Sequence, residues 1–229
     1  MTQAKNLNKD ICRHYFQIGA LFLINAAILL ISSGDWNWLW VWIYLLIYPV
    51  YTVINSVLLP GDLLAERGRS KQDLKTWDTT LSKIGILPGI AIPLIAGLDH
   101  RWGWSPDYGT IVHLAGLFFY LTGNIIVTWS MYANRYFSTF VRIQSDREHT
   151  VATGGPYRIV RHPGYVGILL NTLFTPLILG SFWALVPAAV MAILYILRTH
   201  FEDQTLQQEL QGYADYATHV RYRLIPLLW

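Results

Sequence analysis

The stretch GYVGILLNTLFTPLILGSFWALVPAAVMAILYIL, residues 164–197, contains no aspartate, glutamate, lysine or arginine. A helix needs about 20 consecutive apolar residues to cross a bilayer, so these 34 residues exceed one span and allow two short ones. Gly180 and Ser181 separate its two apolar halves. The stretch therefore predicts a tight helical hairpin in a membrane. Its residues leave open whether both arms cross the bilayer or form one re-entrant hairpin.

The composition of the 229-residue chain indicates the same class for the whole protein. Hydrophobic residues make up 53% and charged residues 14%, whereas a soluble domain carries about 25% charged residues. The chain has 10 tryptophans and 14 tyrosines, which favour membrane interfaces. We expect a single membrane domain over residues 1–229. The net charge of +3 is small, and we expect no nucleic-acid partner. Cys12 is the one cysteine, which excludes an internal disulfide.

Other apolar runs precede the hairpin. The polar N-terminus shows no small-residue cleavage site, so we expect the first run to be a retained transmembrane helix and not a signal peptide. The third and fifth runs are short, and Pro88 and Pro93 predict a kink in the third. The chain therefore predicts an all-α integral membrane bundle of about six transmembrane helices: 15–33, 38–59, 84–98, 110–131, 164–179 and 182–197.

The basic residues divide unevenly between the two sides of this bundle. With six spans both termini lie on one side, and of the 17 lysines and arginines only Arg101 falls on the other. Cytoplasmic loops of membrane proteins are rich in lysine and arginine. We therefore expect a multi-pass protein with cytoplasmic N and C termini, in the inner membrane of a bacterium or the endoplasmic reticulum of a eukaryote. The basic side holds Lys5, Lys9, Arg13, Arg67, Arg69, Lys71, Lys75, Lys83, Arg135, Arg142, Arg147, Arg158, Arg161, Arg198, Arg221 and Arg223.

Polar and aromatic residues concentrate in GGPYRIVRHPGYVG, residues 154–167, just before the hairpin. Pro163 fits the first position of a helix, and a helix N-terminus offers unpaired N–H groups and a partial positive charge. Arg158, Arg161 and His162 cluster there. The stretch therefore predicts a cradle for a ligand with an anionic group. Contact of the arginines with lipid headgroups is the alternative on these residues alone.

A second polar cluster follows the last apolar run. Arg198 and Glu202 are four residues apart and share one helix face. Charge at the end of a membrane helix tends to mark function, although an intrahelical ion pair is the alternative. The next residues predict a C-terminal amphipathic helix, which either lies on the membrane surface or, as we favour, folds over residues 154–167. Its apolar face consists of Leu206, Leu210, Tyr213, Ala217 and Val220.

The two clusters, followed by GYADY and RYRLIP near the C-terminus, resemble the isoprenylcysteine carboxyl methyltransferase family and its bacterial relatives. The resemblance covers about residues 134–229 and extends more weakly to LLAERGRSKQDLKTWD at 63–78. The motif R-H-P-x-Y-x-G is specific to a superfamily, since phospholipid N-methyltransferases and membrane sterol reductases are similar in the same region. The resemblance implies that residues 1–133 form N-terminal transmembrane helices and that residues 134–229 form the cofactor-binding and catalytic half.

The resemblance implies S-adenosyl-L-methionine as the cofactor, bound at the cytoplasmic face by the C-terminal half, and no metal. Arg198 matches the position that contacts the substrate, so it is the implied catalytic and substrate-binding residue. This chain has Glu202-Asp203 where the family often has two glutamates, which leaves the role of Asp203 open. The positions that match the family's cofactor contacts are Gln144, His149, Thr150, Val151, Ala152, Tyr157, His162, Pro163, Gly164, Tyr165 and Glu202.

The family's acceptor is the carboxylate of a lipid-modified cysteine. The resemblance thus implies O-methylation of a prenylated or otherwise lipidated acceptor that arrives through the bilayer. Arg198 would hold the acceptor carboxylate with its planar guanidinium. Two other enzymes fit the same region: a phospholipid N-methyltransferase, and an NADPH-dependent membrane reductase of the sterol type with Arg158 and Arg161 near the nucleotide phosphates. A membrane scaffold that kept the fold is the non-enzymatic alternative.

Overall fold

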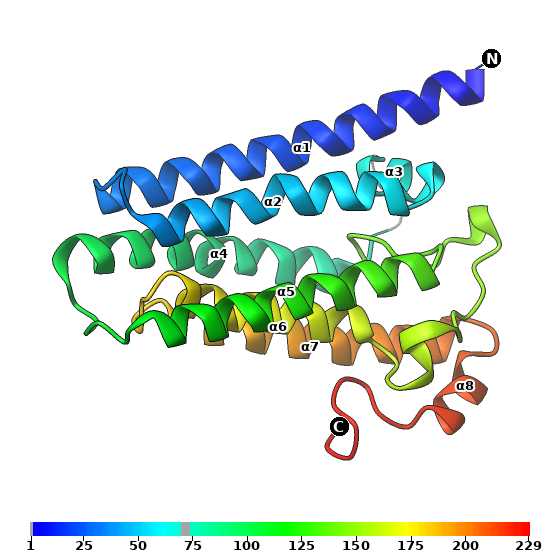
Figure 1. Cartoon of the computed structure of the whole chain (residues 1–229). Helices are drawn as coiled ribbons and strands as arrows, with labels where there is room; N and C mark the ends of the chain where they lie inside the picture. Colours follow the sequence, from blue (N-terminus) through cyan, green and yellow to red (C-terminus); the bar gives the residue numbers. More distant parts are fainter. Residues whose placement is uncertain (1, 70–73) are drawn as a thin grey trace.

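The computed structural model describes residues 2–69 and 74–229, with side chains from Leu7 onward. Lys71 and the side chain of Lys5, which the sequence places on the basic side, lie outside the described residues. Every regular element in the described ranges is helical (Figure 1), which confirms the all-α class. The elements are α1 (Thr2–Ser33), α2 (Leu39–Leu58), α3 (Gly61–Gly68), α4 (Thr76–Trp102), α5 (Thr110–Ala133), η1 (Ser145–Arg147), η2 (Gly155–Arg158), α6 (Pro163–Ile178), α7 (Leu185–Glu209) and α8 (Tyr213–His219).

Five of the described helices, α1, α2, α4, α5 and α7, are long and apolar enough to cross a membrane. The expected number of six spans is approximate, because α6 has 16 residues and extends only about 24 Å at 1.5 Å per residue. The third span is longer than predicted. It has 27 residues and stays helical through Pro88 and Pro93. The predicted hairpin is present, and α6 begins at Pro163 as the sequence indicates.

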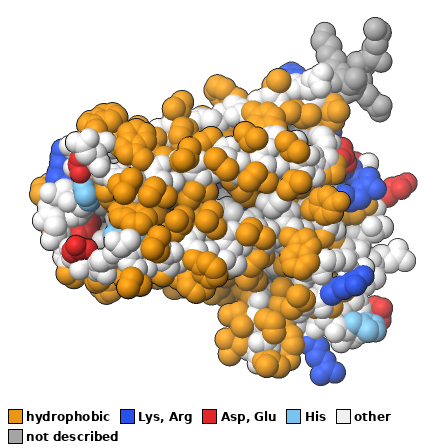
Figure 2. Space-filling view, viewed as in Figure 1, with side chains coloured by type: hydrophobic (Ala, Val, Ile, Leu, Met, Phe, Trp, Pro, Cys, Tyr) orange, Lys and Arg blue, Asp and Glu red, His pale blue; other side chains and the backbone are white. Residues whose placement is uncertain are grey.

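Hydrophobic side chains cover the flank of the bundle, and charged side chains gather near its ends (Figure 2). The helices alternate in direction along the chain, so that α3, the segment 134–162 and α8 meet at one end (Figure 1). We call this the basic end, because the arginines that line the cavities described below lie there. Arg101 lies at the opposite end, in the last turn of α4.

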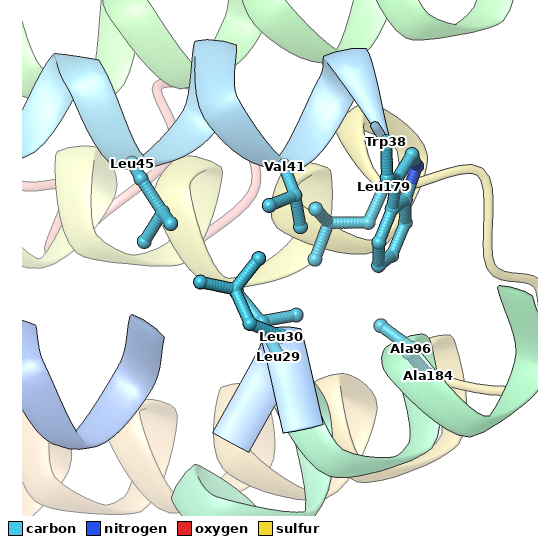
Figure 3. Close-up of a cluster of buried hydrophobic side chains, with 8 residues drawn as sticks. All are labelled: Leu29, Leu30, Trp38, Val41, Leu45, Ala96, Leu179 and Ala184. Carbon is cyan, nitrogen blue, oxygen red and sulfur yellow. The ribbon is translucent and has the colours of Figure 1, made fainter. Parts of the chain in front are cut away.

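The opposite end is closed by a buried apolar cluster and one buried carboxylate. Leu29, Val41, Ala96 and Leu179 belong to the cluster, which joins α1, α2, α4 and the α6–α7 turn (Figure 3). The carboxylate of Asp99 accepts hydrogen bonds from Ser105 and from the Ser181 hydroxyl, the latter at 2.5 Å. The α6–α7 turn is thereby fixed to the end of α4, which sets where α6 and α7 enter the site at the other end.

The C-terminal amphipathic helix is not the single helix that the spacing predicts. Helix α7 continues to Glu209, and Gly212 then turns the chain with φ +83° before α8 begins. The apolar side chains pack against one another and against the segment before α6, and not on a membrane surface. Leu210, Tyr213 and Tyr216 are buried there beside Ile143, Val151, Leu206, Ala217 and Val220. The C-terminal region therefore folds over the site, as favoured from the sequence.

Candidate active site

A cavity of about 250 Å³ lies at the basic end, between α6, α7, α8 and residues 134–152. It brings together the two polar clusters, which the sequence separates by the whole α6–α7 hairpin. Ten of the twelve residues singled out from the sequence line it: His149, Thr150, Val151, Ala152, Tyr157, His162, Gly164, Tyr165, Arg198 and Glu202.

Gln144 and Pro163 do not line the cavity. Gln144 is buried, and its side chain donates a 2.7 Å hydrogen bond to the Tyr136 carbonyl and accepts one from Arg147 at 2.9 Å. Pro163 is the first residue of α6 and is also buried. Both side chains therefore shape the backbone around the cavity.

One short hydrogen bond joins the two halves of the site. The Tyr165 hydroxyl on α6 donates to Glu202 Oε2 on α7 at 2.6 Å. Glu202 lies one turn beyond Arg198 on the same helix, yet these two form no ion pair within the described structure. The intrahelical pair that the spacing allowed is therefore absent there, and each side chain has a partner on another element.

Arg198 is held by Asp78, which the sequence reading missed. Asp78 lies in the first turn of α4 and is 0% exposed. Nη2 of Arg198 donates to Asp78 Oδ2 at 3.1 Å and to the Thr139 carbonyl at 2.7 Å. Nε lies 2.6 Å from Oδ1 in an ionic contact that is not aligned as a hydrogen bond. Asp78 also accepts the Val141 N–H at 2.8 Å. An acid in a first helical turn suits the helix dipole, so its sequence position gave no sign of this role.

Asp203 has a structural network of its own. Its carboxylate is 0% exposed and accepts hydrogen bonds from Nε and Nη2 of Arg161, at 2.7 and 3.0 Å. Arg223 Nε donates to it at 2.8 Å and the Tyr213 hydroxyl at 3.0 Å. His162 Nε2 lies 3.2 Å from the same carboxylate. The sequence leaves the role of Asp203 open. In the described structure, Asp203 joins α6, α7 and the C-terminal segment.

This network changes the expected anion cradle. The cationic side chain of Arg161 faces Asp203 and the carbonyls of Val220 and Arg221. Arg158 is exposed and does not line the cavity. The expectation that Arg158, Arg161 and His162 gather around a ligand is wrong for Arg158, because η2 turns its side chain to solvent. A charge already paired with Asp203 is also less available to a ligand.

The wall of the cavity near α8 is aromatic and uncharged. Burial raises the pKa of Tyr157 and of Tyr213 above the usual range of tyrosine, and it raises the pKa of Tyr216 to about 12. Burial, with Arg142 and Arg147 nearby, lowers the pKa of His149 to about 4. These rings are therefore neutral at neutral pH and offer flat faces that suit an aromatic or cationic ligand group.

Two ion pairs fix the segment that carries this wall. Arg142 pairs with the buried Glu66 at 3.0 Å, and Arg147 pairs with Asp62 at 3.0 Å. Both acids belong to α3, so this short helix holds residues 142–147 from outside the cavity. No sequence pattern marks any member of these pairs as part of the site, since each has the appearance of an ordinary surface charge along the chain.

The chain matches proteins of known type over this same region. Residues 111–211 match the family model of phospholipid methyltransferase. Over 140 residues the chain is 30% identical to protein-S-isoprenylcysteine O-methyltransferase B of Arabidopsis thaliana, covering 60% of this chain and 68% of that protein. The chain belongs to the isoprenylcysteine carboxyl methyltransferase family. It is therefore a multi-pass membrane methyltransferase by class.

Two further relatives of this methyltransferase family member carry the same enzyme name. Protein-S-isoprenylcysteine O-methyltransferase A of Arabidopsis thaliana is 30% identical over 131 residues, which cover 56% of this chain and 63% of that protein. Protein-S-isoprenylcysteine O-methyltransferase of Schizosaccharomyces pombe is 40% identical over 50 residues, covering 22% of this chain and 21% of that protein. The family model and these relatives differ in the acceptor that their names state, a phospholipid or an isoprenylcysteine.

Proposed function

We propose that this family member transfers a methyl group from S-adenosyl-L-methionine to the carboxylate of a lipid-modified cysteine or a similar hydrophobic acid. The observation that carries the proposal is the cavity itself, which places Arg198 and Glu202 beside a wall of uncharged aromatic rings. The excess of lysine and arginine at the basic end supports a cytoplasmic location for this end and for both termini. The membrane would be the inner membrane of a bacterium or the endoplasmic reticulum of a eukaryote.

The chemistry of the cavity residues fits this cofactor. Glu202 suits the ammonium group or the ribose hydroxyls, and the faces of Tyr157 and Tyr165 suit the adenine or the sulfonium. Gly164 allows close packing at this point, because a Cβ there would lie 2.5 Å from the Phe137 ring. His162 fits the cofactor carboxylate less well than the sequence suggested, since its Nε2 already faces Asp203 and Tyr213. The N-terminus of α6 remains for that group.

The residues of the chain then have distinct tasks in the transfer. S-adenosylmethionine supplies a methyl group bound to a sulfonium, which a nucleophile can accept. An acceptor carboxylate is already ionised at neutral pH, so no side chain has to remove a proton. Arg198 orients the carboxylate through the part of its guanidinium that does not face Asp78. Asp78 contacts Nε and Nη2 of this guanidinium and holds it in place. The buried tyrosines exclude water from the reacting oxygen.

Methylation of a phospholipid amine is the second candidate, because the matching family model carries that name. An amine acceptor has to lose a proton before it can attack, and an arginine is a poor partner for an ammonium group. The reductase alternative has less support than the sequence gave it, because Arg158 is exposed and Arg161 is bound to Asp203.

The test is calorimetric binding of S-adenosylhomocysteine to the detergent-purified protein, with NADPH as the comparison ligand. We expect micromolar binding of S-adenosylhomocysteine to wild type and a loss of about tenfold or more in Glu202→Ala, since hydrogen bonds to a charged group contribute about 1.5–3 kcal/mol. Glu209→Ala is the matched control: Glu209 lies on the same helix but pairs with Lys75 at the surface. Binding of NADPH alone would instead assign the protein to the reductases, and binding of neither ligand would reject enzyme function of both kinds.

A further inference from the structure

A second cavity, of about 650 Å³, lies beside the first. Helices α1, α2, α3 and α5 form most of it, together with Thr139 and Phe140. Its volume falls in the range of small-molecule sites, about 300–1,000 Å³. Most of its wall belongs to helices that span the membrane, and apolar or aromatic side chains predominate, among them Phe16, Leu21, Tyr48 and Val127. This cavity is suited to an apolar chain.

The two cavities share part of one wall. Arg67, Thr139 and Phe140 line both of them. The carbonyl of Thr139 also accepts the hydrogen bond from Arg198. The shared wall is therefore directly adjacent to the residue assigned to the acceptor carboxylate.

Arg67 is the unusual group in this wall. Its Nη1 is buried and has no hydrogen-bond partner in the described part of the chain. Its guanidinium lies 5.8 Å from the centre of the Phe137 ring. The acids next to it on α3 are engaged elsewhere, Asp62 with Arg147 and Glu66 with Arg142. A buried cation without an anion is costly, and a bound anion removes that cost.

We propose that the second cavity holds the apolar chain of the methyl acceptor and that Arg67 pairs with the acceptor carboxylate at the shared wall. The ligand class is an amphiphile with one lipid chain and an anionic head. Its chain lies between α1, α2 and α5, and its head faces Arg198 from the side of Thr139. A guanidinium repels an ammonium group, so the site selects against amine acceptors. This inference rests on the proposed function and specifies its substrate.

The test compares two matched probes, N-acetyl-S-farnesyl-cysteine and its methyl ester, which differ in the charge of the head and by one methyl group. Binding is measured by calorimetry in detergent to wild type, Arg67→Met and Arg13→Met. We expect wild type to bind the acid at least about tenfold more tightly than the ester, as for hydrogen bonds to charged groups. Arg67→Met should lose most of that preference, because only Arg198 then contacts the acid, and should keep its affinity for the ester and for S-adenosylhomocysteine. Arg13 is exposed and lines neither cavity, so Arg13→Met should behave as wild type.

Retention of the preference in Arg67→Met, or its absence in wild type, would overturn the proposal. A second measurement on wild type does not depend on the folding of a variant: a probe with a photoreactive group on its head amide is cross-linked and mapped by mass spectrometry. Cross-links in residues 61–69 or 137–140 support the proposal, and cross-links confined to other segments contradict it. If S-adenosylhomocysteine does not bind wild type but the acid preference is present, the proposed function fails and the Arg67 site stands.

Discussion

At the scale of single residues, the pair of Asp78 and Arg198 is the central feature of the site. Asp78 is fully buried and Arg198 is 16% exposed in its side chain. A guanidinium has five N–H donors, and the carboxylate and the Thr139 carbonyl occupy one side of it. The remaining side can contact an acceptor in a fixed orientation. Under the proposed function, Asp78 is a positioning residue and Arg198 contacts the acceptor carboxylate.

Asp78→Asn removes the negative charge but keeps an oxygen that can accept the Val141 N–H. We expect the acceptor kcat/KM to fall by about tenfold or more, because Arg198 loses its ionic partner and its orientation. The affinity for S-adenosylhomocysteine should change by less than about twofold. Steady-state kinetics and calorimetry measure the two effects, and Asp78→Glu should recover part of the activity. Asp107→Asn, an exposed acid between α4 and α5, is the control. Equal loss of cofactor binding in Asp78→Asn would show a general structural role instead.

At the scale of elements, the close contact of α5 and α6 positions the helix that carries Tyr165. A Cβ on Gly167 would lie 2.5 Å from the Gly123 carbonyl oxygen and 2.7 Å from Val127. Asn171 on α6 donates a 3.2 Å hydrogen bond to Asn124 on α5 in the same region. Small residues let membrane helices approach closely, and amide side chains bond across them. This contact holds α6, and thus Tyr165, in place against α5.

Gly167→Ala should destabilise this interface, because the facing atoms include backbone that cannot move aside without shifting a helix. Overpacking of this kind costs about 1–3 kcal/mol. We expect a lower midpoint of thermal unfolding in detergent, measured by intrinsic fluorescence. The matched control is Gly19→Ala on α1, where a Cβ meets no atom within 4 Å and alanine favours the helix. An unchanged midpoint in Gly167→Ala would mean that the two helices separate easily.

At the scale of the whole molecule, the bundle has two chemically different ends. Arg101, with Asp35 and His100 paired at 2.9 Å, lies at the end opposite the cavities. Both cavities and their arginines lie at the basic end. A lipid chain can therefore approach from the bilayer while a water-soluble cofactor approaches from the basic end. This arrangement fits an enzyme that joins a membrane substrate to a soluble one.

The orientation of the bundle can be tested with the natural cysteine. Cys12 is exposed near the basic end of α1, so we expect a membrane-impermeant maleimide to label it only when the cytoplasmic face is accessible. In sealed vesicles with the external face outward, Cys12 should stay unlabelled until detergent is added. A Cys12→Ser variant that also carries Asp107→Cys should show the opposite pattern, because Asp107 lies at the other end. Labelling of Cys12 in the sealed vesicles would reverse the assigned topology.

Local sequence patterns predict the class of the protein and the α6–α7 hairpin, whereas the resemblance to a known family implies the ten residues that line the cavity. Hydrophobic runs and helical spacing are local properties, and they are readable without knowing which helices are neighbours. The start of α6 at Pro163 was predictable for the same reason. The predicted C-terminal amphipathic helix was correct about which face is buried but wrong in being one continuous helix. The backbone turns at Gly212, and the apolar residues keep a nearly helical spacing in the sequence across this turn.

Which charges meet depends on how the helices pack together. Asp78 and Arg198 are 120 positions apart in the chain, and no local pattern joins them. The same holds for Asp203, which the sequence left open and the fold surrounds with Arg161 and Arg223. Arg67 had the appearance of one more basic residue of a cytoplasmic loop until the packing of α3 brought it to the wall between two cavities. A partner's position depends on how whole helices pack, which the periodicity of a single helix does not contain.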